Sequence, residues 1–289
     1  MFPASFGYFA PRSLDEALDL LVAHGENAKL LAGGHSLLPA MKLRLASPRY
    51  LIDIGQLPGL RGIKQDDATV VIGALTLHAE IAASPLVRRL LPGLAEAASV
   101  IGDLQVRNRG TIGGSVAHAD PGADFPVILS ALGASFVIQG RAGARIVGAG
   151  EFFVDFFTTA LAHDEIVTEI RVPLPPTGSG TAYAKLPHPA SGYVVVSAGA
   201  LVVRESSGRC RSASVALGGI DNRPVRAEAT ETALAGVPLT AESIERAAAS
   251  AAEGAHPMDD EYASAEYKRR VAVVYARRAL EEAARRAAA

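Results

Sequence analysis

Two glycine pairs are the residues best suited to hold an anion in this 289-residue chain. The first lies in residues 31–39, which read Leu-Ala-Gly-Gly-His-Ser-Leu-Leu-Pro. Glycine has no side chain, so the main chain at Gly33 and Gly34 can approach a ligand closely and can adopt positive φ. The free N–H groups and the dipole at the start of a following helix favour a phosphate, and Ser36 could add a hydroxyl donor. Taken alone, such a corner also describes an ordinary tight turn.

The second glycine pair, Gly113 and Gly114, lies in residues 109–124, which read Arg-Gly-Thr-Ile-Gly-Gly-Ser-Val-Ala-His-Ala-Asp-Pro-Gly-Ala-Asp. Hydroxyl side chains flank it, and the carboxylates of Asp120 and Asp124 follow, where a carboxylate suits ribose hydroxyls. Neither motif matches the one-loop dinucleotide fingerprint or the lysine-bearing nucleotide loop. The residues themselves therefore predict a dinucleotide-like anion held by two loops.

Other reactive side chains give weaker signals. His118, Asp120 and Asp124 lie close in sequence, but metal sites usually need three or four convergent ligands, so we predict no metal. Asp120 is equally suited to start a turn before Pro121. Cys210 lies between two arginines, which would favour a reactive thiolate, although a lone cysteine at a strand start is typically inert.

Composition narrows the class of protein. The chain has a formal net charge of −2 without a block of like charge, so neither nucleic acid nor an anionic membrane is an expected partner. Its single cysteine excludes an internal disulfide and an iron–sulfur cluster, which needs about four cysteine ligands. The N-terminus does not resemble a signal peptide, and a reduced, cytoplasmic location is expected. The longest apolar run, residues 193–203, is too short for the ~20 residues of a transmembrane segment.

Helical and strand patterns alternate around the two motifs. Ser13 and Glu16 form a capping box for a helix that carries Leu14, Leu18, Leu21 and Val22 on one face. Further patterns predict a strand at 29–32, a helix at 35–45, a strand at 50–54, a strand at 69–72, a helix capped by Thr76, a helix at 94–100, and strands at 135–138 and 169–172.

A proline- and glycine-rich segment, residues 173–180, predicts the main domain boundary. Strands at 193–203 and 212–218 and two alanine-rich helices should follow it. The last helix places Tyr267, Val271, Val274 and Tyr275 on one face, with Lys268, Arg269, Arg277 and Arg278 mostly elsewhere.

The two glycine motifs, about eighty residues apart, closely resemble the two FAD-binding signatures of molybdenum hydroxylase flavoprotein subunits. That family includes the medium subunit of aerobic carbon monoxide dehydrogenase. The resemblance runs essentially end to end, through the proline-rich hinge to the Glu-Tyr-Lys-Arg-Arg segment that begins at Glu266.

The resemblance implies an α+β fold. Residues 1–177 would form a two-lobed FAD-binding domain of the vanillyl-alcohol-oxidase-like (PCMH-type) class, with lobes at about 1–57 and 58–177. Residues 178–289 would form a smaller C-terminal α/β domain of the carbon monoxide dehydrogenase flavoprotein type.

The resemblance also implies an electron relay within an oxidoreductase. A large partner subunit would carry the molybdenum cofactor, a small one the [2Fe–2S] clusters, and the FAD of this chain would pass electrons to an external acceptor. The assembly expected is a cytoplasmic dimer of heterotrimers. A carbon monoxide dehydrogenase is the leading assignment; an N-heterocycle or aldehyde dehydrogenase of the same family is the alternative. A stand-alone FAD oxidase and a flavin-free scaffold subunit are alternatives of another class.

Site residues follow from the resemblance one by one, with no catalytic residue among them. The pyrophosphate cradle would comprise Ala32, Gly33, Gly34, His35, Ser36, Thr111, Ile112, Gly113, Gly114 and Ser115. Asp124 would lie near the ribose or adenine, Lys185 near the flavin ring, and Tyr193 against the isoalloxazine. A cation near flavin N1 would stabilise the reduced ring. Ser115 and His118 depart from the amides common in carbon monoxide dehydrogenase medium subunits, which favours another branch.

Overall fold

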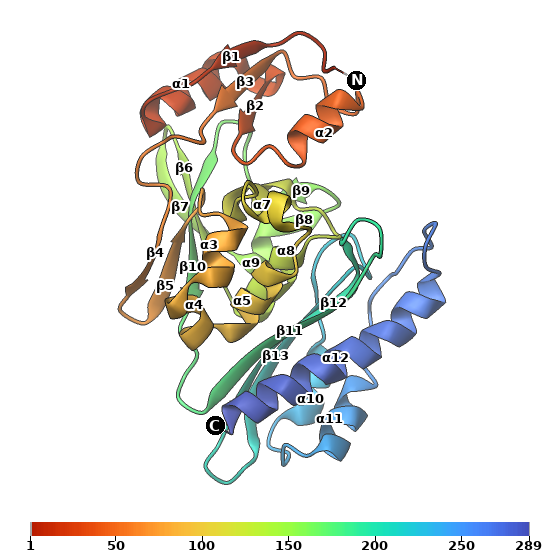
Figure 1. The fold of residues 1–289 in the computed structure, drawn as a ribbon. Coiled ribbons are helices and arrows are strands. Elements are labelled where there is room, and N and C mark those ends of the chain that lie inside the picture. Colours follow the sequence, from red (N-terminus) through yellow and green to blue (C-terminus); the bar gives the residue numbers. More distant parts are fainter. Residues whose placement is uncertain (1, 289) are drawn as a thin grey trace.

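The computed structural model describes residues 2–288 and contains three larger sheets, each with its own helices, plus one small hairpin (Figure 1). The first two sheets belong to the part of the chain before the proline-rich segment. The third sheet and the last three helices follow that segment.

The first lobe is built on a parallel three-stranded sheet of order β1-β3-β2. Its elements are β1 (Gly7–Phe9), α1 (Leu14–His24), a 3-10 turn (Gly25–Asn27), β2 (Ala28–Leu31), α2 (Leu37–Lys42) and β3 (Tyr50–Asp53).

Helix α1 begins as expected, because the Ser13 hydroxyl accepts from the Glu16 amide at 3.2 Å. The residues expected on one face differ in burial: Leu18 and Leu21 are buried, whereas Val22 is 54% exposed. Helix α2 is shorter than predicted because Arg44, just beyond it, adopts a left-handed φ of 64° that no helix continues through.

The second lobe contains an antiparallel five-stranded sheet of order β4-β5-β10-β6-β7. The strands are β4 (Ile63–Asp66), β5 (Thr69–Gly73), β6 (Ser135–Gly140), β7 (Gly143–Gly148) and β10 (Ile166–Pro173), with a small hairpin of β8 (Phe153–Asp155) and β9 (Thr158–Thr159). The helices between them are α3 (His78–Ala83), α4 (Pro85–Leu90), α5 (Pro92–Ser99), α6 (Leu104–Arg107), α7 (Ile112–His118), α8 (Asp124–Ala131) and α9 (Ala149–Phe152). They pack beside the sheet in Figure 1.

Thr76 does not cap helix α3 as predicted. Its hydroxyl instead donates to the Gly62 carbonyl at 3.1 Å and accepts from the Gly62 amide at 2.9 Å. The Glu80 carboxylate binds the Leu77 amide at the start of the helix. Thr76 therefore joins two loops of the second lobe.

The third sheet is antiparallel, with strand order β11-β12-β13-β14. Its elements are β11 (Ser179–Pro187), β12 (Val194–Arg204), β13 (Cys210–Gly218), β14 (Val225–Arg226), α10 (Glu228–Leu234), α11 (Ala241–Ala248) and α12 (Ala265–Ala287). In Figure 1 the long α12 runs along this sheet, and the second lobe contacts it through α5 and α8.

The face of the last helix that carries Tyr267, Val271, Val274 and Tyr275 is only partly buried, with Val271 and Tyr275 packed against the core of the C-terminal part. The buried stripe of α12 consists mainly of alanines, whereas Tyr267 is 47% exposed. Small side chains let the helix approach the sheet closely: a Cβ on Gly180 of β11 would lie 2.0 Å from the Ala283 carbonyl oxygen. Lys268, expected away from this face, is buried, and its ammonium group binds the Asp260 carboxylate at 2.6 Å and the Met258 carbonyl.

The second lobe and the third sheet share a tightly packed boundary. All eight residues of α8 are buried. A Cβ on Gly93 would lie 2.8 Å from the Ala182 amide nitrogen, and the Gly93 amide donates to the buried Thr181 hydroxyl at 3.0 Å. Arg286 of α12 pairs with Glu96 of α5. This boundary holds the β11–β12 hairpin against the second lobe. No helix among residues 2–288 combines the length and apolar character needed to span a membrane.

Candidate functional site

A cleft of about 1080 Å³ lies where the three sheets meet. It is lined by residues 25, 26 and 28–37 of the first lobe, by several second-lobe segments between 74 and 167, and by the hairpin residues 191–193. Ligand pockets usually measure about 300–1,000 Å³, so this volume suits an unusually large ligand. The glycine motifs, which are distant in sequence, both line this cleft.

The first glycine motif presents a row of free amides. Gly34 has φ of +77°, a conformation that favours glycine. Within residues 2–288 no acceptor contacts the backbone N–H groups of Gly33, Gly34, His35 or Ser36, all of which line the cleft. Successive unpaired N–H groups form a concave anion site, so this loop can hold a phosphate. Helix α2 has only six residues, and the local amides therefore matter more than a long-helix dipole.

The second glycine motif is different, because its amides already have partners. Ile112 donates to the Thr76 carbonyl, Gly113 to the Ala74 carbonyl, and Gly114 to the Thr111 hydroxyl, at 2.8–3.1 Å. What this motif offers the cleft is the exposed Cα of Gly114 and the half-buried Ser115. Ile112 is fully buried in the second-lobe core and does not line the cleft.

At two of the four motif glycines, other protein atoms occupy the position that a side chain would need. A Cβ on Gly33 would lie 2.2 Å from the Arg109 carbonyl oxygen, which brings the two motifs into direct contact. A Cβ on Gly113 would lie 2.5 Å from the Ala74 Cβ. At Gly114 the added atom would meet only the Thr111 hydroxyl, at 2.9 Å. Protein packing therefore requires the absence of a side chain at Gly33 and Gly113.

Asp124 and Lys185 form one buried unit. The Lys185 ammonium group donates to the Asp124 carboxylate at 2.8 Å and to the Val100 and Gly192 carbonyls, so its three protons are all used. The Tyr183 hydroxyl also donates to Asp124, at 2.9 Å. Asp124 lines the cleft, whereas Lys185 lies behind it. Because the two side chains touch, they cannot serve opposite ends of one ligand, as the sequence suggested.

Burial is the main influence on this unit. It raises the pKa of Asp124 to about 6, although the neighbouring Lys185 and Tyr183 groups favour the carboxylate. Burial and the nearby carboxylate also raise the pKa of Tyr183 well above its usual value. The site therefore contains a carboxyl group that titrates near neutrality.

Tyr193 stands on the β11–β12 hairpin and faces the cleft with 46% of its surface exposed. Its ring packs over Gly122, where a Cβ would lie 3.2 Å from Cδ1. The hairpin is held to the second motif because Val194 donates to the Gly122 carbonyl at 3.0 Å. An exposed aromatic face fixed in this way can stack on a planar ring.

The remaining polar candidates are placed as follows. Asp120 lines the cleft and also accepts from the Gly122 amide at 2.8 Å, so it does form the turn. His118 lines the cleft with its ring 4.9 Å from that of Phe157. Cys210 is fully buried, and burial raises the pKa of its thiol. Among residues 2–288 no three metal-binding side chains converge.

The sequence did not single out His78, which also lines the cleft and is only 5% exposed. A histidine at the start of a helix gives no signal of its own, because the fold must first bring it against the second motif. Because Gly110 has no side chain, it leaves the space that the His78 ring fills.

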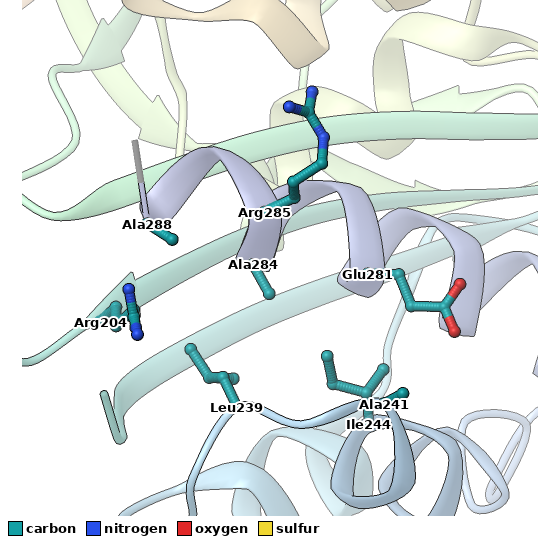
Figure 2. A pocket seen from close by; sticks show the side chains of 8 residues that line it. All are labelled: Arg204, Leu239, Ala241, Ile244, Glu281, Ala284, Arg285 and Ala288. Carbon is teal, nitrogen blue, oxygen red and sulfur yellow. The ribbon is translucent and has the colours of Figure 1, made fainter. Parts of the chain in front are cut away.

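A second, smaller hollow of about 330 Å³ lies in the C-terminal part (Figure 2). Leu239 and Ile244 line it beneath α12, and the Arg285 side chain extends away from them in the figure. Arg285 pairs with Glu282. The lining holds no converging acid–base pair or nucleophile, so the large cleft is the candidate site.

A two-lobed α+β unit with a dinucleotide-sized cleft, joined to a smaller C-terminal unit, defines an FAD-binding protein of the PCMH type. Two family models match the chain. The FAD binding domain in molybdopterin dehydrogenase covers residues 4–175, and the CO dehydrogenase flavoprotein C-terminal domain covers residues 181–283.

The chain belongs to the family of FAD-binding medium subunits of molybdenum hydroxylases. It is 44% identical over 98% of both chains to the carbon monoxide dehydrogenase medium chain of Hydrogenophaga pseudoflava. A solved carbon monoxide dehydrogenase from that organism matches with a TM-score of 0.95, covering 99% of both chains. Quinoline 2-oxidoreductase from Pseudomonas putida 86 matches at 32% identity with a TM-score of 0.93, covering 99% of both chains. The expected fold, family and FAD cofactor are thereby confirmed, and the chain is an oxidoreductase subunit.

Proposed function

We propose that this chain is an electron-transfer subunit that receives electrons from [2Fe–2S] clusters of a partner subunit and passes them to an external acceptor. The observation that carries the proposal is the row of four amides without protein acceptors, set in a cleft large enough for a dinucleotide. The chain has one cysteine, which is fully buried, so it cannot supply the ligands of such clusters itself.

Different residues of the cleft would bind different parts of the FAD molecule. The amides of residues 33–36 would hold the pyrophosphate, with Ala32 beside them, and the hydroxyl groups of Thr111 and Ser115 would lie opposite. Close approach of the ligand would be possible at Gly114, where no side chain projects into the cleft. Tyr193 would pack against the isoalloxazine. Bound FAD supplies a redox centre that takes up and releases electrons.

Asp124 and Lys185 would act together beside the Tyr193 end of the cleft. Since all three ammonium protons of Lys185 already have acceptors, its charge would reach the flavin through Asp124 rather than by direct contact. A carboxyl group titrating near neutrality could also exchange a proton with the surroundings of the ring.

We further propose the finer features of the complex. It would be a cytoplasmic dimer of heterotrimers, with a large molybdenum subunit and a small iron–sulfur subunit. Carbon monoxide is the leading substrate, supported by the similarity to the Hydrogenophaga medium chain. An N-heterocycle or aldehyde remains the alternative, supported by the quinoline-oxidising relative and by Ser115 and His118. For the domain organisation we propose a boundary at 177/178, between the two matched ranges.

The alternatives of another class have less support. A stand-alone oxidase would need a substrate site of its own, yet the C-terminal hollow is small and holds no converging catalytic group. A flavin-free scaffold would have no reason to keep four adjacent amides unpaired in a large cleft.

One experiment separates these functions. The chain is purified alone and with its partner subunits, and the flavin released on denaturation is measured. A relay subunit holds FAD, which substrate reduces only when the partners are present. Turnover of a small substrate by the isolated chain would show an oxidase, and a colourless complex would show a scaffold.

A further inference from the structure

His78 is fixed firmly in the wall of the cleft. It is the first residue of α3, and its amide donates to the Gly110 carbonyl at 3.0 Å. Its ring meets Phe125 edge-on, with 5.1 Å between the centroids. A Cβ on Gly110 would lie 2.4 Å from His78 Nε2, so the imidazole fills the space left by that glycine. The ring therefore has little freedom to turn away from the cleft.

The imidazole lacks hydrogen bonds inside the protein. Nδ1 is fully buried and has no partner within residues 2–288. The other buried side-chain atoms in this condition belong to Ser179, Ser197 and Arg277, none of which lines the cleft. Buried polar groups are nearly always paired, and an unpaired one lowers stability. Nε2 also has no protein partner within residues 2–288, but it is not among these fully buried atoms, so it is the ring nitrogen that a ligand in the cleft can reach.

The ring is uncharged, which defines what it can bind. Burial, with His35 and Arg107 nearby, lowers the pKa of His78 to about 4. A neutral imidazole has one donor and one acceptor nitrogen. Because an enclosed N–H without an acceptor is rarer than an unpaired acceptor, the proton belongs on Nε2 and the bare lone pair on Nδ1. Nε2–H, beside Gly110, is then the donor available to the cleft.

The position of His78 indicates which part of the cleft it serves. Phe125, which it contacts, directly follows Asp124, and Gly110 is packed against both His78 and the Val106 carbonyl. Val106, Asp124 and Tyr193 line the same cleft. We propose that His78 is a further FAD-contacting residue, whose Nε2–H donates a hydrogen bond to an oxygen atom of the bound cofactor. This inference rests on FAD occupying the cleft.

Three variants of the full chain test the inference. His78→Leu removes both ring nitrogens at similar size, His78→Gln places an amide near the position of Nε2, and His78→Asn places one near that of Nδ1. FAD dissociation constants of the reconstituted apoproteins are measured by flavin fluorescence, with thermal unfolding of each apoprotein as the check on folding. We expect the Leu and Asn variants to bind FAD about tenfold more weakly, the effect of losing one hydrogen bond. The Gln variant should stay within about threefold of the parent chain.

Each outcome is decisive. Equal FAD affinity in all three variants, or recovery with Asn rather than Gln, would overturn the role of Nε2 while leaving the relay function intact. If the parent chain bound no FAD, both proposals would fail together. Should the Leu variant not fold, the comparison between Gln and Asn still decides the matter, because both keep a polar side chain.

Discussion

At the scale of single residues, the four motif glycines have different physical reasons for lacking a side chain. Gly34 needs its positive φ. Gly33 and Gly113 are pressed against protein atoms of the second lobe. Only Gly114 is exposed in the cleft, where an added Cβ would meet no atom except the Thr111 hydroxyl, at 2.9 Å. Mutations at these positions should therefore separate folding from cofactor binding.

We predict that Gly114→Ala weakens FAD retention while changing the free energy of unfolding of the apoprotein by no more than about 1 kcal/mol, because alanine suits a helix and the new Cβ closely approaches only the Thr111 hydroxyl. Gly33→Ala should destabilise the apoprotein itself by about 1–3 kcal/mol, since its Cβ overlaps the Arg109 carbonyl. Denaturant unfolding and flavin content of both variants provide the measurement. Full flavin occupancy in a folded Gly114→Ala chain would contradict the assignment.

Asp124 should give the apoprotein a recognisable pH dependence. Its pKa is raised to about 6 in the folded chain from an ordinary 3.8, so the folded state holds the proton more tightly. The stabilising contribution is fully present below about pH 4 and is lost as the pH rises through 6. Relative to Asp124→Asn, the free energy of unfolding of the parent chain should fall by up to about 3 kcal/mol between pH 4 and 7. A pH-independent difference between the two chains would contradict this.

At the scale of elements, the close approach of α12 to β11 organises the C-terminal part. The alanine stripe brings the helix backbone so near the sheet that β11 requires a glycine at the crossing. Tight packing of this kind tolerates added volume poorly.

Gly180→Ala should therefore destabilise the protein by at least about 1–3 kcal/mol, because the new methyl group would overlap the Ala283 carbonyl. Gly150→Ala is the matched control: that glycine is exposed in a helix, with nothing within 4 Å of an added Cβ. Thermal unfolding compares the two. Equal melting temperatures would show that the helix can shift without cost.

Lys268 links α12 to the segment that precedes it. Its buried ammonium group binds Met258 and Asp260, so Lys268→Met should leave the Met258 carbonyl and the Asp260 carboxylate without their donor. We predict faster proteolysis between residues 255 and 263 and a lower melting temperature. Arg270→Met, at a position 77% exposed, should change neither. Identical cleavage rates in the two variants would refute the anchoring role.

At the scale of the whole molecule, a tightly packed boundary joins the second lobe to the C-terminal sheet. Helices α5 and α8 lie between their sheets, and the Glu96–Arg286 pair and the Gly93–Thr181 contact tie them together. The cleft depends on this boundary, since Tyr193 reaches it from the C-terminal side.

We predict that the parent chain unfolds in calorimetry without a separate transition for the C-terminal part, and that Thr181→Val lowers the melting temperature of that common transition. The reason is that the fully buried helix α8 belongs to the second-lobe core and also packs against β12 and β13 of the C-terminal sheet. Two well-separated transitions would contradict this coupling. If the C-terminal part unfolded separately, Tyr193 would leave the cleft and FAD would be lost before the rest of the chain unfolds.

Local chemistry determined much about this protein. The glycine pairs, the Ser13 cap and the strand runs at 50–54, 69–72 and 135–138 need only neighbouring residues, and the end-to-end resemblance supplied the family, fold and cofactor. Whether a side chain is buried depends on which element packs against it, and only the tertiary structure decided that. Val22 points outward and Lys268 inward because packing overrides helical pattern.

The same division holds inside the site. The sequence predicted that the two motifs and Tyr193 belong to one site. Residue spacing could not show that the Lys185 ammonium group donates its three hydrogen bonds to Asp124 and two backbone carbonyls. Nor could it show that His78 meets Gly110, or that one motif keeps its amides free while the other bonds them within the protein. Glycine patterns are local, whereas hydrogen-bond partners and buried charges belong to surfaces that meet only after the chain has folded.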